Sequence, residues 1–336
     1  MIENKFDEIS NTFKKIDSRN YDLSCCFLCG EDVNNENSTL EHIIPKWLLN
    51  KYNLWENTIS LLNKTSIKYR NLLIPCCSLC NNNYLSKVEN EVKKRSEAGF
   101  NEFKKISREV LFYWLGKIFY GLIYKELHLP IKISNSSLGS ITTPELLKEF
   151  EAHYMFLQGI RDKHRFNNFF PASIFIFETQ CPEKQEFQWD FLDNVFSLSI
   201  AIRMGTIGIV AVLQDGRASE SIKEVFDDFN SFPLHPIQFK EAAAKIIYKA
   251  TLLNRVPKYI SFIEDGIIVT SQLPLMGLSS KSIYDPGNES DYVKMLSHFV
   301  GIPVNELNPE QNKVMTWIKN ENNQLKYIDC NKFPWY

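Results

Sequence analysis

Two cysteine clusters of identical layout constrain the fold more than any other feature of the chain. They read Cys25-Cys26-Phe27-Leu28-Cys29 and Cys76-Cys77-Ser78-Leu79-Cys80, and they hold six of the eight cysteines. Each contains a C-x-x-C pair, a spacing that lets one tight turn present two thiolates to a tetrahedral zinc ion. We therefore predict a structural Zn(II) site formed by Cys26, Cys29, Cys77 and Cys80.

The doublets leave one position open in each cluster. Cys25 or Cys76 could replace its neighbour through C-x-x-x-C spacing, although we assign Cys26 and Cys77. Disulfides or redox-active pairs are the alternative use of such cysteines. A reducing cytoplasm disfavours disulfides, and redox motifs do not usually occur as matched pairs, so zinc is favoured.

Between the clusters lies a short apolar strand that carries an acid beside a histidine, in the run Ser38-Thr39-Leu40-Glu41-His42-Ile43-Ile44-Pro45. Asn71-Leu72 follows shortly before the second cluster, and Asn81 comes directly after it. With these pieces in this order, the sequence resembles the zinc-knuckle variety of the HNH endonuclease family. The resemblance covers roughly residues 20–95.

The resemblance implies a ββα-metal module: a hairpin with His42, a loop with Asn71, and a helix that begins just after Cys80. By the match, His42 is the catalytic general base, a role that suits a near-neutral side chain. Glu41 and Asn81 are the matching ligands of a catalytic Mg(II) or Mn(II) ion, which prefers oxygen ligands. Asn71 orients the histidine loop, and Glu89, about two turns along the helix, is a further candidate ligand.

The chain departs from the family pattern at several points. Glu41 stands where Asp is common, Asn81 stands where His is common, and three successive asparagines blur the third motif position. A lone histidine on an apolar strand is more often a hydrogen-bonded core residue than a base. The position of His42 between two knuckles favours catalysis.

Positive charge is concentrated in and after this motif. Between Lys46 and Arg108 there are twelve Lys and Arg against five Asp and Glu, whereas the whole chain has a formal net charge of −2. We predict that Lys46, Lys68, Arg70 and Lys87 contact the phosphates of a nucleic acid. For Lys93, Lys94 and Arg95, a solvated helix face explains the charge equally well.

The length of 336 residues is about twice that of a usual domain, so two domains are expected. We predict an α+β protein: an N-terminal HNH module over residues 1–106, with its core at about 20–95, and a larger mixed α+β domain over 107–336. A buried connecting helix at about 108–128 begins the second domain, because apolar residues lie nearly all round it.

Pattern and turn signals predict further elements. The helices are expected at 84–105, 144–160, 219–229 and 236–253, and Thr143 can cap the second of them. The strands are expected at 173–177, 196–202, 206–213, 259–263 and 267–270. A turn at Arg203-Met204-Gly205 joins the second and third strands, and the last two form a hairpin around Glu264-Asp265-Gly266. His164, His235 and His298 show no ligand spacing and are expected to be structural.

The most apolar stretches are interrupted by Lys117 and Arg203 and fall short of the roughly 18 to 20 residues of a membrane span. The N-terminus lacks the basic start and apolar core of a secretory signal. We therefore expect a cytoplasmic protein with no membrane partner.

These features together predict a metal-dependent endonuclease that hydrolyses DNA, with RNA as the alternative substrate. By analogy with bacterial HNH chains that carry an unfamiliar second domain, we expect a role in antiviral defence, with a second domain that senses a trigger such as a nucleotide signal, sets specificity or forms a homo-oligomer. The alternatives are a non-catalytic zinc module that binds nucleic acid, and a nuclease subunit that a partner such as an ATPase must activate.

Overall fold

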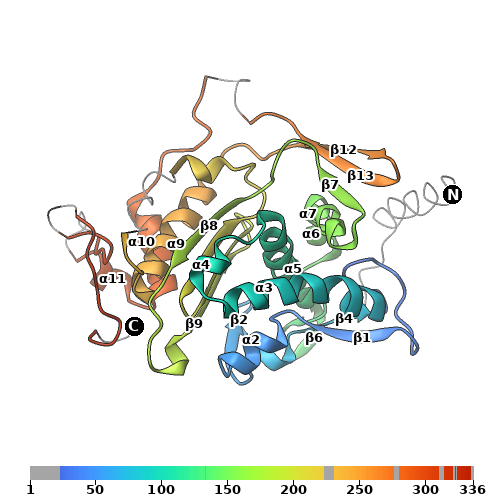
Figure 1. The fold of residues 1–336 in the computed structure, drawn as a ribbon, viewed down its shortest axis with the longest axis horizontal. Helices are drawn as coiled ribbons and strands as arrows, with labels where there is room; N and C mark the ends of the chain where they lie inside the picture. The colour runs from blue at the N-terminus through green and yellow to red at the C-terminus, as the bar shows by residue number, and fades with distance from the viewer. Residues whose placement is uncertain are drawn as a thin grey trace. The chain divides into compact units, whose positions relative to one another are not determined.

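The computed structural model describes residues 23–132, 134–222, 231–275, 280–309, 314–320, 322 and 324–333 (Figure 1). The chain divides into two compact units that interleave along the sequence. Unit 1 comprises Met1–Lys94, Ser107–Phe169 and Tyr259–Ser271, and unit 2 comprises Arg95–Ile106, Phe170–Lys258 and Gln272–Tyr336. Each contains helices and strands, so the chain is mixed α+β, as expected. These units are defined by packing, whereas the predicted boundary between residues 106 and 107 separates functional domains. That boundary stays a prediction.

Unit 1 is built from small sheets around one long helix. The strands pair as β1 (Ser38–His42) with β4 (Leu73–Cys77), β2 (Thr58–Ser60) with β3 (Ser66–Lys68), β5 (Pro130–Lys132) with β6 (Asn135–Ser140), and in the order β12 (Tyr259–Glu264), β13 (Ile267–Gln272), β7 (His164–Phe166). The helices are α2 (Lys46–Lys51), α3 (Ser86–Glu97), α5 (Arg108–Leu127), α6 (Pro144–Glu149) and α7 (Glu151–Leu157), with shorter turns at η1 (Tyr69–Asn71), η2 (Cys80–Leu85) and η3 (Gln158–Arg161).

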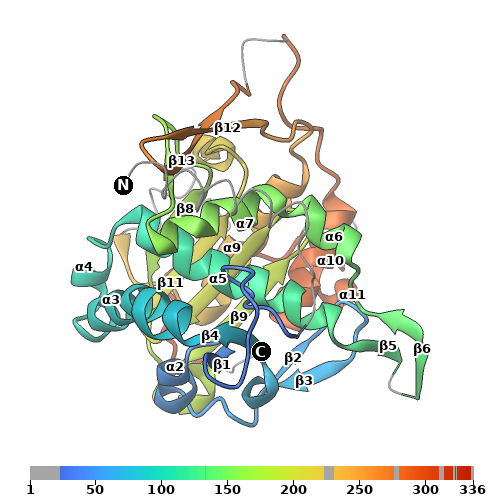
Figure 2. The ribbon, with the colours of Figure 1, turned by 90° about the vertical axis from the view of Figure 1, so that its right-hand side faces the viewer.

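Helix α5 forms the core of unit 1. Its bounds, Arg108–Leu127, are those expected, and Ser107 caps it by accepting a hydrogen bond from the Glu109 amide. Almost every residue from Leu111 onward is buried, because β4, α6 and α7 pack against it. Gly121 lets Ile74 and Ile43 pack close to the helix, because a Cβ there would lie 3.2 Å from Ile74 and 3.3 Å from Ile43. Figure 2 shows the β1 and β4 pair beside this helix.

Unit 2 contains an antiparallel sheet covered by helices. The strand order is β8 (Ser173–Glu178), β11 (Ile207–Val212), β10 (Ser199–Met204), β9 (Trp189–Asn194). Helix α9 (Pro236–Thr251) packs against β10 and β11, and α10 (Glu289–Val300) packs against α9 (Figure 1). The short elements are α4 (Phe100–Phe103), α11 (Val304–Leu307), η4 (Gln185–Phe187) and η5 (Ala218–Ile222).

Several predicted elements are confirmed, including the central strands 173–177 and 206–213 and the hairpin at 259–270. In that hairpin Asp265 and Gly266 both have positive φ, 49° and 80°, as a tight two-residue turn requires. The helix expected at 84–105 is wrong at Gly99, whose φ of 91° ends α3 before α4 begins. The helix expected at 219–229 lies largely outside the described residues, which include only η5.

Two other predictions need correction. The helix expected at 144–160 is broken into α6, α7 and η3, although Thr143 does cap its start by accepting from the Leu146 amide. The strand expected at 196–202 begins at Ser199 and continues to Met204, so Arg203 belongs to β10 and not to a turn. Among the described residues, no helix is long and apolar enough to cross a membrane.

His153, on α7, makes the stability of unit 1 sensitive to acid. Its ring is fully buried, and its Nε2 lies 3.1 Å from the Gly116 carbonyl oxygen of α5. Burial lowers the pKa of His153 to about 4, from an ordinary value of about 6.5. Because the unfolded chain binds the proton more tightly, the stabilisation is complete above about pH 6.5 and is lost as the pH falls toward about 4.

We expect the free energy of unfolding to drop by about 2 kcal/mol more in the wild type than in His153→Gln between pH 7 and pH 5. Urea unfolding at the two pH values, followed by tryptophan fluorescence, measures this difference. Gln can still donate to the Gly116 carbonyl but does not titrate. Equal acid sensitivity in the two proteins would show that His153 is not the responsible group.

Candidate functional site

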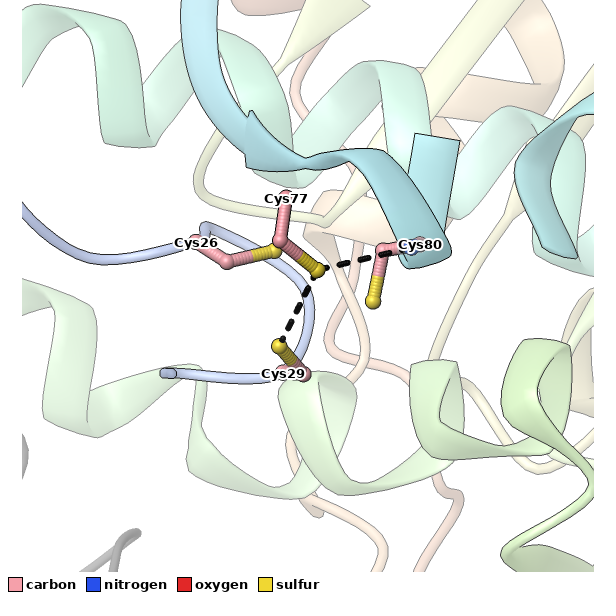
Figure 3. A group of neighbouring side chains, drawn as sticks. All are labelled: Cys26, Cys29, Cys77 and Cys80. Atoms are coloured by element: carbon pink, nitrogen blue, oxygen red, sulfur yellow. Dashed lines mark hydrogen bonds between the residues drawn. The ribbon is translucent and has the colours of Figure 1, made fainter. Parts of the chain in front are cut away.

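The four predicted zinc ligands lie together in unit 1. Cys26, Cys29, Cys77 and Cys80 are buried, and their sulfur atoms all lie within 4.8 Å of one another (Figure 3). The Sγ atoms of Cys29 and Cys77 are 3.8 Å apart, which is about the S···S spacing of a tetrahedral zinc site with Zn–S bonds of about 2.3 Å. Four buried sulfur donors at this spacing fit a zinc ion, which would hold residues 26–29 and 77–80 together.

Hydrogen bonds shape the turn at residues 26–29, the first of the two zinc knuckles. The Gly30 amide donates to the Cys26 carbonyl at 2.8 Å, and Gly30 has a φ of 73°, which a tight turn at this point requires. The Phe27 amide donates to the Pro75 carbonyl at 3.0 Å, which fixes the turn against β4. The Gln158 side chain also donates to the Leu28 carbonyl at 2.9 Å.

The neighbouring members of the two doublets have different surroundings. The Cys25 thiol donates to the Asp32 carboxylate at 3.6 Å and is outside the four-cysteine group. The Cys76 sulfur lies 3.8 Å from that of Cys26, at the edge of the group. Hydrogen bonds from neighbouring thiols, that of Cys29 above all, hold the pKa of Cys26 far below its ordinary value, whereas the hydrogen bonds with Cys26 raise the pKa of Cys29 and Cys80. Within the group, the thiolate is therefore favoured at Cys26.

The cysteine group joins a strand pair to a helix. Strands β1 and β4 are antiparallel, with Glu41 opposite Ile74 and His42 opposite Leu73. A helical segment then begins at Cys80, the last residue of the second cluster, and continues through η2 into α3. The Ile43 amide donates to the Leu72 carbonyl at 2.9 Å, so the turn that contains Asn71 lies beside the end of β1.

His42 lies at the end of β1 and is half-buried. Its ring contacts that of Trp55 edge to face, with centroids 5.7 Å apart. Within the part of the chain that the structure describes, Nδ1 is buried and has no hydrogen-bond partner. Burial lowers the pKa of His42 to about 4, and the positive charges of Lys46 and Lys117 act in the same direction. The imidazole is therefore neutral at pH 7 and able to accept a proton.

Glu41 and Glu89 are brought together, but around a lysine of α5. Lys117 forms ion pairs with the carboxylates of Glu41 and Glu89, the latter at 2.8 Å. Lys117 is 1% exposed, and the Glu41 side chain is also buried. Burial raises the pKa of the Glu41 carboxyl to about 7 against the opposing attraction of Lys117. Sequence patterns had shown Lys117 only as an interruption of an apolar run, although a lysine buried in a helix needs anionic or oxygen partners.

The two asparagines predicted for the site have different surroundings. The Asn81 amide group donates to the Thr39 hydroxyl at 3.0 Å, toward the start of β1. Asn71 is exposed in the η1 turn, and no hydrogen bond joins its side chain to another described residue. The assignment of Asn81 as a cation ligand stays a prediction.

The four basic residues predicted to contact phosphates fall into two pairs. Lys46 and Lys87 are exposed on α2 and α3. Lys68 and Arg70 both form ion pairs with Glu56, at 2.7 Å for Lys68. Part of the positive charge that the sequence suggested is thus already neutralised within the chain.

Comparisons with known proteins give no further identification. No family model matches the chain, and neither the curated proteins nor the solved structures include a match.

We expect purified protein to contain about one zinc ion per chain by plasma mass spectrometry. Cys26→Ser and Cys80→Ser should each lose most of it and melt at a lower temperature, because metal-binding free energy stabilises the folded site. Cys25→Ser and Cys181→Ser are matched controls outside the four-cysteine group and should keep the metal. Full zinc content in Cys26→Ser, or its loss in Cys25→Ser, would contradict this ligand set.

Proposed function

We propose that this chain is an endonuclease of the HNH type that hydrolyses phosphodiester bonds in DNA, with His42 as the general base. The observation that carries the proposal is the surroundings of His42. Its imidazole is neutral and half-buried, and it ends a strand pair that four clustered cysteines connect to a helix. In the reaction, the imidazole would accept a proton from the water that attacks phosphorus.

The zinc ion has a structural role in this proposal. Held by Cys26, Cys29, Cys77 and Cys80, it would fix the start of the helix relative to β4 and the first knuckle. With four sulfur ligands it has no open position for water or substrate, so it would take no part in the chemistry.

The Mg(II) or Mn(II) ion that the resemblance implies does not fit the arrangement of Glu41 and Glu89. Both carboxylates are already ion-paired with the buried Lys117 ammonium group, and the Asn81 side chain is bonded to Thr39. The proposal therefore assigns no step to a cation at these residues and rests on His42.

The same ion pairs favour a second candidate function, a zinc-dependent module that binds nucleic acid without cutting it. If the carboxylates cannot hold a catalytic cation, exposed basic residues such as Lys46 and Lys87 would still contact phosphates. A third candidate is a nuclease subunit that cuts only after a partner protein has rearranged these ion pairs. The defence role and the sensing function of the second domain remain proposals by analogy.

Cleavage of supercoiled plasmid DNA distinguishes these functions. We expect the wild type to nick or linearise the plasmid in Mg(II) or Mn(II), and His42→Ala to cut about 10² to 10⁴ times more slowly, the usual contribution of a general base. His298→Ala, which alters an exposed histidine of α10, is the matched control and should cut normally. Parallel reactions in EDTA and on single-stranded DNA and RNA define the cation and substrate requirements.

Two results of this assay would count against the enzyme. Equal cutting by wild type and His42→Ala would remove His42 from the mechanism. Absence of cutting in every condition, together with retained binding to the plasmid, would favour the binding module or the partner-dependent subunit.

The basic residues give a separate test by salt dependence. Each lost phosphate contact should lower the slope of log affinity against log salt by about 0.9, so Lys46→Gln and Lys87→Gln should each reduce it by about that amount. Glu56→Gln should tighten binding, because it frees Lys68 and Arg70. Fluorescence anisotropy with a labelled duplex measures both effects, and Asp291→Asn, which frees Lys294 in unit 2, is the control. Unchanged affinity in Glu56→Gln would exclude Lys68 and Arg70 from the interface.

A further inference from the structure

Lys117 is held in a cage of oxygen atoms. Its Nζ contacts the Glu41 carboxylate, the Glu89 carboxylate at 2.8 Å, and the backbone carbonyl oxygens of His42 and Ile43 at 2.9 and 3.3 Å. These acceptors come from the end of β1, from the residue that follows it, and from α3. Oxygen donors of this kind, two of them carboxyl groups, are the ligands that a hard cation prefers in proteins.

The ammonium group occupies the position among these oxygens that a bound cation would take. Lys117 is 1% exposed and brings one positive charge to two carboxylates, and its three hydrogens are shared among the four acceptors. A divalent ion placed among the same oxygens would have to displace the ammonium or lie against it. Either outcome is costly, because a displaced Lys117 would remain buried without its partners.

We propose that Lys117 is the built-in cation of the Glu41 and Glu89 site, so that the wild-type chain does not bind a divalent metal ion there. Its ammonium pairs with both carboxylates and holds the backbone of His42 and Ile43, which makes it a positioning residue for the end of β1. Because Lys117 is buried, it does not touch a substrate. The site becomes a divalent-cation site only when the lysine is removed.

This inference does not rest on the proposed function. It concerns cation binding in the absence of nucleic acid, so its failure and the failure of DNA cleavage are separate results. The Asn81 side chain, bonded to Thr39, is not part of the cage and does not enter the test.

Mn(II) binding to zinc-loaded protein, followed by electron paramagnetic resonance, tests the inference. We expect the wild type to bind no Mn(II) at Glu41 and Glu89, so Glu89→Gln should leave the amount of bound Mn(II) unchanged. Lys117→Met should bind one Mn(II) per chain at least tenfold more tightly than the wild type, and Lys117→Met with Glu89→Gln should lose it. Preloading with zinc keeps the cysteine thiolates from binding the probe.

Lys125→Met is the matched control, because Lys125 is a partly buried lysine on the same helix that donates to the Leu73 carbonyl at 3.0 Å. It should bind no Mn(II). Circular dichroism shows whether each variant is folded, and Lys117→Gln, which keeps hydrogen-bond donors, replaces Lys117→Met if the latter unfolds. Mn(II) that binds the wild type and is lost in Glu89→Gln would overturn the inference, as would a folded Lys117 variant that binds none.

Discussion

The ion pairs of one buried lysine connect the elements around the candidate site. Lys117 lies on the helix that forms the core of unit 1, and its ammonium group contacts side chains or carbonyls of β1, the following residue and α3. Removing one partner of such a group would leave an uncompensated charge in the interior, which costs about 3 to 5 kcal/mol. The end of β1, and with it His42, is therefore fixed by electrostatics as well as by pairing with β4.

The cysteine group could be predicted from the sequence because its information is local. Two C-x-x-C turns each present a pair of sulfurs by themselves, and pairing of β1 with β4 then places the second knuckle. The choice within each doublet depends on tertiary contacts: the thiol of Cys25 reaches Asp32, whereas Cys26 lies in the four-cysteine group. The spacing of the cysteines along the chain therefore cannot distinguish Cys26 from Cys25.

Other features were missed because they depend on distant polar partners. Lys117 is 75 residues from His42, so no local pattern connects them. Strand β9 was not predicted because its sequence, Trp189–Asn194, includes two aspartates, and buried strands are expected to be apolar. Arg203 of β10 and Lys240 of α9 both pair with Asp190, which lets the strand carry the charge inside the sheet. Arg203 itself was assigned to a turn for the same reason: a charged residue ended an apolar run.

A tethered ammonium and a divalent ion can serve the same carboxylates in different ways. The lysine brings its charge as part of the folded chain, whereas Mg(II) must give up tightly held water and find near-octahedral oxygen ligands at about 2.1 Å. An ammonium group cannot act as a Lewis acid on a phosphate, and this one is shielded from solvent. Successive side chains of a strand point to opposite faces, so Glu41 turns inward while His42 stays half-exposed on the other face. In this arrangement the buried face of β1 holds the ion pairs and supplies rigidity, and in the proposed function the chemistry would take place on the face that carries His42.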